Sequence, residues 1–101
     1  MDFKIIWSDS AIGDLRDICR YISRDNPLVA GNGGQIIFDH VRILSSFPMV
    51  GPVYPRRSNG NHREIVCLSY QIFYKLSTEN KTVEILRVWH GARGEPPAMN
   101  Q

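Results

Sequence analysis

The side chains best suited to chemistry gather in the last third of this chain, between residues 62 and 93. They include the guanidinium groups of Arg63, Arg87 and Arg93 and the imidazole of His90. An imidazole with an ordinary pKa of about 6.5 can donate or accept a proton near neutral pH, and a guanidinium can hold an anion at two points. The sequence therefore places a candidate site, either for acid–base chemistry or for binding, in this stretch.

The distribution of charge points to the same half of the molecule. The chain has 101 residues and a net charge of +2. Residues 1–55 contain five Lys or Arg against six Asp or Glu, whereas residues 56–101 contain seven against four. Arg56 and Arg57 open this basic half, in a connection that also carries Tyr54 and the turn signal Asn59-Gly60. The excess suits an anionic partner but is too small to identify nucleic acid.

The two cysteines, Cys19 and Cys67, fall on apolar positions of expected elements and indicate buried thiols in a reducing compartment. A disulfide between them stays open as an alternative. The chain has no Cys-x-x-Cys motif and no Cys/His spacing typical of a metal site, so neither a metal nor a cofactor is expected. It also has no signal peptide and no apolar run of membrane-spanning length, so the expected location is the cytoplasm.

Three runs of alternating apolar residues predict strands over 62–68, 70–76 and 82–89. Their connections are so short that the strands must pair as an antiparallel meander. Strict alternation places Arg87 in an apolar row with Val83, Ile85 and Trp89. A charge there needs a partner, for which Glu64 or Glu84 is expected, or else an open binding face.

The first half must supply the layer that covers this sheet. Residues 3–7 predict a further strand, with Ile6 suggesting that both of its faces are partly covered, as in an interior strand. Ser8 is a good N-cap for a first helix with an apolar stripe, and Pro27 opens a second helix that runs to Pro48. A helix that begins at Pro27 conflicts with Gly31-Asn32-Gly33-Gly34, because each glycine costs about 1 kcal/mol relative to Ala. Either the first turn of the second helix frays, or the helix starts near Gln35; as a third alternative, the glycines allow the two helices to approach closely.

The expected fold class is α+β: an N-terminal strand, an antiparallel two-helix hairpin and a three-stranded antiparallel meander, stacked in two layers. The length argues for a single domain over residues 1–101. Residues 94–101, which contain Pro96-Pro97, are expected to form an extended or frayed tail.

This order of elements resembles the RelE/ParE superfamily of type II toxins, closer to the ParE branch. The resemblance covers residues 3–93 and rests on the order of several short motifs: Trp7-Ser8 with Ala11, Leu15, Ile18, Tyr21 and Ile22; Asn26-Pro27-x-x-Ala30; Leu44-x-x-x-Pro48-x-x-Gly51; Arg63; Tyr70-x-Ile72-x-Tyr74; and Val88-x-His90-Gly91-x-Arg93. It implies a RelE/ParE-like fold and a toxin that is encoded with an antitoxin, which blocks it by wrapping a segment over its surface.

Targets differ between the branches, since RelE-like members cleave messenger RNA on the ribosome and ParE-like members inhibit DNA gyrase. A ribonuclease needs a base, an acid and cations at the phosphate. Arg63, His90 and Arg93 are the candidate catalytic residues in that case, with His62 as another route. However, Ile65 and Gln71 stand where further cations would be expected, and no Tyr follows Trp89.

The sequence therefore favours a ParE-like toxin that inhibits DNA gyrase by binding it. A RelE-like endoribonuclease acting on the ribosome and messenger RNA is the alternative, and an inactive antitoxin-binding plasmid-stabilisation module is the second alternative. Either a homodimer or a hetero-oligomer with the antitoxin is compatible with the sequence. The candidate residues for binding the target or the antitoxin are Arg56, Arg57, Arg63, Arg87, His90 and Arg93.

Overall fold

A computed structural model describes the backbone of residues 2–25, 27–53 and 62–90, and the side chains of these residues apart from 21–33. Arg56, Arg57, Arg93 and the predicted tail lie outside the described residues. The elements in chain order are β1 (Lys4–Trp7), α1 (Asp9–Asp25), α2 (Pro27–Val41), the short 3-10 helix η1 (Arg42–Ser45), β2 (His62–Cys67), β3 (Tyr70–Ser77) and β4 (Thr82–His90).

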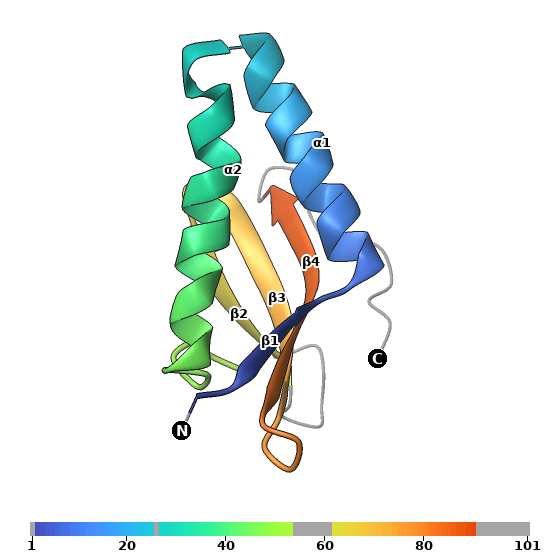
Figure 1. The fold of residues 1–101 in the computed structure, drawn as a ribbon, viewed down its shortest axis with the longest axis vertical. Coiled ribbons are helices and arrows are strands. Elements are labelled where there is room, and N and C mark those ends of the chain that lie inside the picture. Colours follow the sequence, from blue (N-terminus) through green and yellow to red (C-terminus); the bar gives the residue numbers. More distant parts are fainter. Residues whose placement is uncertain (1, 26, 54–61, 91–101) are drawn as a thin grey trace.

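The strands form one four-stranded mixed sheet in the order β1-β4-β3-β2. Strands β2, β3 and β4 pair in antiparallel fashion, whereas β1 lies parallel to β4. Both helices lie on the same side of the sheet as an antiparallel hairpin (Figure 1). The predicted α+β fold, with a strand, a helix hairpin and a meander, is confirmed.

The core lies between the helices and one face of the sheet. Its buried members come from every layer: Ala11, Ile18, Ile37, Val41, Leu44, Ile65, Cys67, Tyr70, Ile72, Tyr74, Leu76, Val83, Ile85 and Val88. The predicted apolar stripes of both helices supply the helix side of this core, because residues three or four apart share one side of a helix. Cys19 and Cys67 are free thiols, and burial raises the pKa of Cys67.

Strand β1 lies at one edge of the sheet, so the sequence-based expectation of an interior strand is wrong. Ile6 is 42% exposed. The expectation failed because the apolar run is only as long as the strand itself, and such a short run does not reveal its place in a sheet. The predicted N-cap is confirmed: the Ser8 hydroxyl accepts the Ala11 N–H at 3.1 Å at the start of α1.

An irregularity in β4 explains the odd position of Arg87. Phe73 pairs with Arg87, but the next residue of β3, Tyr74, pairs with Ile85, so Leu86 is an extra residue in β4. Such a bulge reverses the faces of the residues that follow it. Val83 and Ile85 therefore face the helices, while Trp89 packs with Phe73 in a separate cluster. Arg87 does not belong to the row that strict alternation predicted.

Helix α2 runs through Gly31-Asn32-Gly33-Gly34, so the alternative start near Gln35 is wrong. Gly34 shows why the glycines are tolerated there. A Cβ atom at this position would overlap the Cys19 sulfur of α1. The absence of a side chain lets the two helices approach closely, as the third sequence-based alternative proposed.

Candidate functional site

Arg63 on β2 holds the loop that follows η1. Its Nη1 donates to the carbonyl oxygens of Gly51 at 2.7 Å and Met49 at 3.3 Å. The backbone supports the same contact, because the Glu64 N–H donates to Pro52 O at 3.1 Å and Val53 forms an isolated bridge with Arg63. One nitrogen of this guanidinium, Nη1, is therefore directed at the protein's own backbone.

Tyr74 pairs with Arg63 in the sheet, and its hydroxyl group holds the same loop. Its buried hydroxyl donates to Pro48 O at 2.8 Å and accepts the Gly51 N–H at 3.1 Å. Burial raises the pKa of Tyr74, against the opposing effects of the Gly51 hydrogen bond and the Arg63 charge. A Cβ atom on Gly51 would overlap the Glu64 carbonyl and come within 2.8 Å of the Tyr74 hydroxyl. The loop is thus held closely against the sheet.

This fixed loop presents apolar side chains to solvent. Phe47 is 65% exposed, Met49 57% and Val50 56%. Among the described residues, eleven large apolar side chains are exposed, and these three gather within four positions of one loop. Because Arg63 and Tyr74 hold its backbone, the loop offers a preorganised apolar surface for contact with another molecule.

Arg87 pairs with Asp14 of α1, so the expectation of Glu64 or Glu84 as its partner is wrong. Arg87 Nε lies 2.7 Å from Asp14 Oδ2, and Nη2 lies 2.8 Å from Oδ1. This hydrogen bond to Asp14 raises the pKa of Arg87, against the effect of burial. The guanidinium also lies 5.1 Å from the centre of the Trp89 ring. Its charge is satisfied within the molecule.

His90 ends β4 and contacts Tyr70 edge-on, with 5.1 Å between the ring centres. Arg63 pairs with Tyr74 and His90 with Tyr70, so they lie four residues apart along β3 and on its opposite sides. At about 3.3 Å per residue and about 4.8 Å per strand, their α-carbons are about 16 Å apart. The structure does not bring these two candidate catalytic residues together.

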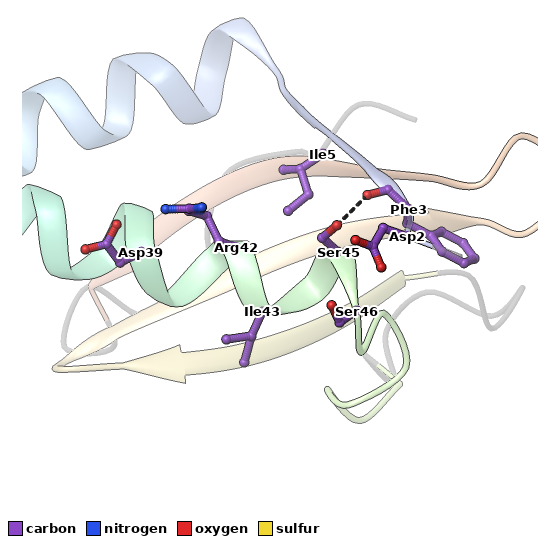
Figure 2. A pocket seen from close by; sticks show the side chains of 8 residues that line it. All are labelled: Asp2, Phe3, Ile5, Asp39, Arg42, Ile43, Ser45 and Ser46. Atoms are coloured by element: carbon purple, nitrogen blue, oxygen red, sulfur yellow. Dashed lines mark hydrogen bonds between the residues drawn. The ribbon is translucent and has the colours of Figure 1, made fainter.

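A surface hollow of about 510 Å³ lies between β1 and the end of α2 (Figure 2). Its lining combines three apolar side chains with acidic, basic and hydroxyl groups: Phe3, Ile5, Ile43, Asp2, Asp39, Arg42, Ser45 and Ser46. Within the described part of the chain, no cluster of three or more His, Cys, Asp or Glu side chains could hold a metal ion. No helix among the described residues is long and apolar enough to cross a membrane.

Comparison with known proteins assigns the chain to a family. Residues 5–94 match the profile described as the ParE toxin of the type II toxin–antitoxin system parDE. The chain belongs to the ParE toxin family. The match begins within β1 and includes α1, α2, β2, β3 and β4 of this ParE toxin. No curated protein matches it.

Solved structures share the ParE fold at low sequence identity. A chain of the chromosomal ParDE toxin–antitoxin system from P. aeruginosa is 20% identical, with a TM-score of 0.71, over 87% of this chain and 95% of that chain. A chain of the toxin–antitoxin complex RelBE2 from Mycobacterium tuberculosis is 24% identical, with a TM-score of 0.58, over 89% of this chain and 99% of that chain. At such identities, the likeness establishes the fold.

The sequence signalled some of the important residues of this ParE toxin and missed others. Arg63 was singled out for its charge, but its contacts with the loop were not foreseen. Nothing in the sequence distinguishes Asp14 from the other polar residues of α1, and only the distance to Arg87 reveals that it holds that guanidinium. Tyr74 and Gly51 belong to the motifs that carry the family resemblance, and the structure shows that they hold the loop after η1 against the sheet. No sequence signal pointed to the hollow beside Arg42.

Proposed function

We propose that this ParE-family toxin arrests growth by binding DNA gyrase and that its cognate antitoxin blocks it. The observation that carries the binding mechanism is the separation of Arg63 from His90, together with the hydrogen bonds that hold Arg63 to Met49 and Gly51. A ribonuclease needs its proton-transferring group and its cations within hydrogen-bond reach of one phosphate. A target-binding toxin needs only a surface.

The antitoxin follows from the family, since ParE is defined as one half of a toxin–antitoxin pair. Both structural relatives also come from toxin–antitoxin systems. Of the residues predicted to bind the target or the antitoxin, His90 at the end of β4 is half-buried. Arg56, Arg57 and Arg93 stay candidates for such contacts, whereas Arg63 and Arg87 are held by internal partners.

The apolar loop at residues 47–50 is the surface that we assign to the target. Three exposed apolar side chains on a fixed backbone suit contact with a protein, because little conformational entropy is lost when a preorganised surface binds. Its backbone is held by Tyr74 and Arg63, while its three apolar side chains stay exposed. Arg56 and Arg57 follow the loop in the chain and would add charge attractive to an anionic partner.

The decisive experiment measures two activities of one purified preparation. We expect the protein to inhibit supercoiling of relaxed plasmid by DNA gyrase at micromolar concentration, and to leave messenger RNA intact on translating ribosomes. Val50→Asp is expected to weaken the inhibition about tenfold, whereas Val66→Asp, at another exposed valine, leaves it unchanged. RNA cleavage without gyrase inhibition would establish the RelE-like alternative. The absence of both activities would favour the inactive antitoxin-binding module.

A further inference from the structure

One side of α2 is apolar although it faces solvent. Residues 36–38 are Ile-Ile-Phe. Successive residues of an α-helix lie about 100° apart around its axis, so only one of these three side chains can point straight into the core. Ile37 is buried, whereas Ile36 is 44% exposed and Phe38 42%. A helix that is apolar on several sides is usually covered on several sides, so this side of α2 is suited to a further contact.

The exposed apolar side continues into η1 as a stripe. Ile36, His40 and Ile43 are related as i, i+4 and i+7, the spacing that places side chains on one side of a helix. Ile43 is 39% exposed and His40 is half-buried. Figure 1 shows α1 along one side of α2, and no other described helix accompanies α2 along its length. Within the described part of the chain, the stripe therefore has no helix packed on it.

Two opposite charges lie on one flank of this stripe. Asp39 and Arg42 are both exposed, and both line the hollow beside β1 (Figure 2). Neither forms an ion pair with another described side chain, although the Asp39 carboxylate accepts a hydrogen bond from Gln35 at 2.8 Å. Each charge thus lacks an opposite charge within the residues that the structure describes.

We propose that two copies of this toxin associate through α2, with the two helices antiparallel about a two-fold axis. When the axis passes next to the peptide bond that follows His40, Asp39 of each copy lies opposite Arg42 of the other, because both residues are equally far from the axis. The symmetry makes this ion pair occur twice. In the same register, Ile43 of each copy falls midway between Ile36 and His40 of the other, so the apolar side chains interlock.

A second copy is the occupant that the charges favour. One register pairs both charges and interlocks both isoleucines, so the surface is complementary to itself. The helical segment over residues 35–45 is about 18 Å long, and a contact of that length buries less than the roughly 1,200–2,000 Å² of a stable interface. We therefore expect a weak dimer, with a dissociation constant on the order of 10 µM. The loop at residues 47–50 lies beyond the helix pair and stays open to the target.

Sedimentation equilibrium of the purified toxin, without antitoxin, tests the association itself. Between about 1 and 300 µM, a range that brackets the expected dissociation constant, the average mass should rise from that of one chain towards that of two. A mass that stays at one chain throughout overturns the proposal. In that case, protection of the amides of residues 35–43 by the product of the neighbouring antitoxin gene would assign the stripe to that partner instead.

Charge reversal tests the register. Asp39→Arg and Arg42→Asp each place two pairs of like charges across the axis, so each variant alone should associate at least about tenfold more weakly. An equimolar mixture of the two variants should recover the affinity of the unmodified protein, because residue 39 of one variant then faces an opposite charge at residue 42 of the other. If the unmodified protein dimerises but the mixture does not recover, the proposed contact is wrong.

Two further variants separate the stripe from general surface effects. Ile43→Asp should weaken dimerisation at least about tenfold, whereas Ile12→Asp, at a similarly exposed isoleucine of α1, should leave it unchanged. Equal losses would overturn the assignment to α2, and if Ile43→Asp fails to fold, the charge variants decide.

The dimer and the proposed function can fail separately. Asp39→Arg and Arg42→Asp leave the loop at residues 47–50 unchanged, so both variants should still inhibit gyrase. Dimerisation without gyrase inhibition would contradict the proposed function alone. Inhibition by a protein that is monomeric at every concentration would contradict the dimer alone.

Discussion

Asp14 and Arg87 lie 73 residues apart in the chain and join helix α1 to strand β4 through two hydrogen bonds of 2.7 and 2.8 Å. Asp14 Oδ2 also accepts the Val88 N–H at 3.0 Å. Strand β1 covers β4 only as far as Ile85, and beyond that point Ser8 Oγ donates to Leu86 O at 3.1 Å. Side chains from the start of α1 thus satisfy the backbone of β4 where its strand neighbour ends.

Replacing Asp14 should therefore destabilise the fold strongly. Asp14→Ala leaves a largely buried guanidinium and the Val88 N–H without their acceptor, and we expect the free energy of unfolding to fall by about 3 kcal/mol. Asp14→Asn retains an acceptor oxygen and should cost less. The measurement is urea unfolding followed by circular dichroism. The control is Asp17→Ala, since the Asp17–Arg20 pair is largely exposed at 3.9 Å and should contribute less than about 0.5 kcal/mol. Equal costs for Asp14 and Asp17 would contradict the prediction.

Two glycines should respond oppositely to alanine. A Cβ atom at Gly51 meets the Glu64 backbone, which cannot move without breaking the sheet, so Gly51→Ala should cost about 2–3 kcal/mol. At Gly13, inside α1, a Cβ atom meets nothing within 4 Å, and Gly13→Ala should stabilise the protein by about 0.5–1 kcal/mol. Thermal unfolding of the two variants gives both signs. A neutral Gly51→Ala would mean that the loop is not held as described.

Substitution of Leu68, in the turn between β2 and β3, should stabilise the protein. Its φ of 57° lies in the left-handed region, where a leucine side chain is strained by about 1 kcal/mol or more. Because Leu68 is also exposed, Leu68→Asn should raise the free energy of unfolding by about 0.5–1 kcal/mol. Val66→Asn, which changes an exposed residue in regular strand conformation, should lower it instead. A loss of stability in both variants would show that Leu68 packs in a way that offsets its strain.

Tyr74 should make the protein sensitive to alkali. Burial raises the pKa of its hydroxyl, so its contribution to stability is present below the unfolded value of about 10 and is lost as pH rises through the folded value. The free energy of unfolding should therefore decline above about pH 10. Tyr74→Phe should flatten this decline, and the loss of two hydrogen bonds should cost about 1–2 kcal/mol at neutral pH. Because burial also raises the pKa of Cys67, the comparison is best made in a Cys67→Ala background.

The features that the sequence predicted well are local. Ser8 caps α1 because its hydroxyl oxygen accepts a backbone N–H of the first helical turn. The short connections around Ser69 and residues 78–81 leave antiparallel pairing as the only option. The motif order added the place of each element in a known fold. These signals depend on neighbours within a few residues, which a single sequence displays directly.

The features that the sequence missed depend on residues far apart in the chain. One extra residue at Leu86 reverses the face of Arg87, and no nearby turn residue announces it. The partner of Arg87 could not be named without the position of α1 over β4. For the same reason, four candidate residues that share a basic stretch looked like one site, although the register of β3 separates Arg63 from His90.

The parallel pairing of β1 with β4 also affects when the protein can fold during its synthesis. Residues 4–7 find their sheet partner only in residues 82–85, so β1 has no neighbouring strand until β4, an inner strand of the sheet, has been synthesised. Contacts of such large sequence separation slow folding. A nascent chain that lacks residues 82–90 has no strand to seat β1 or to pair with Asp14. The protein should therefore acquire its fold only after residues 82–90 have been synthesised, and truncation before Thr82 should prevent folding, which circular dichroism would detect.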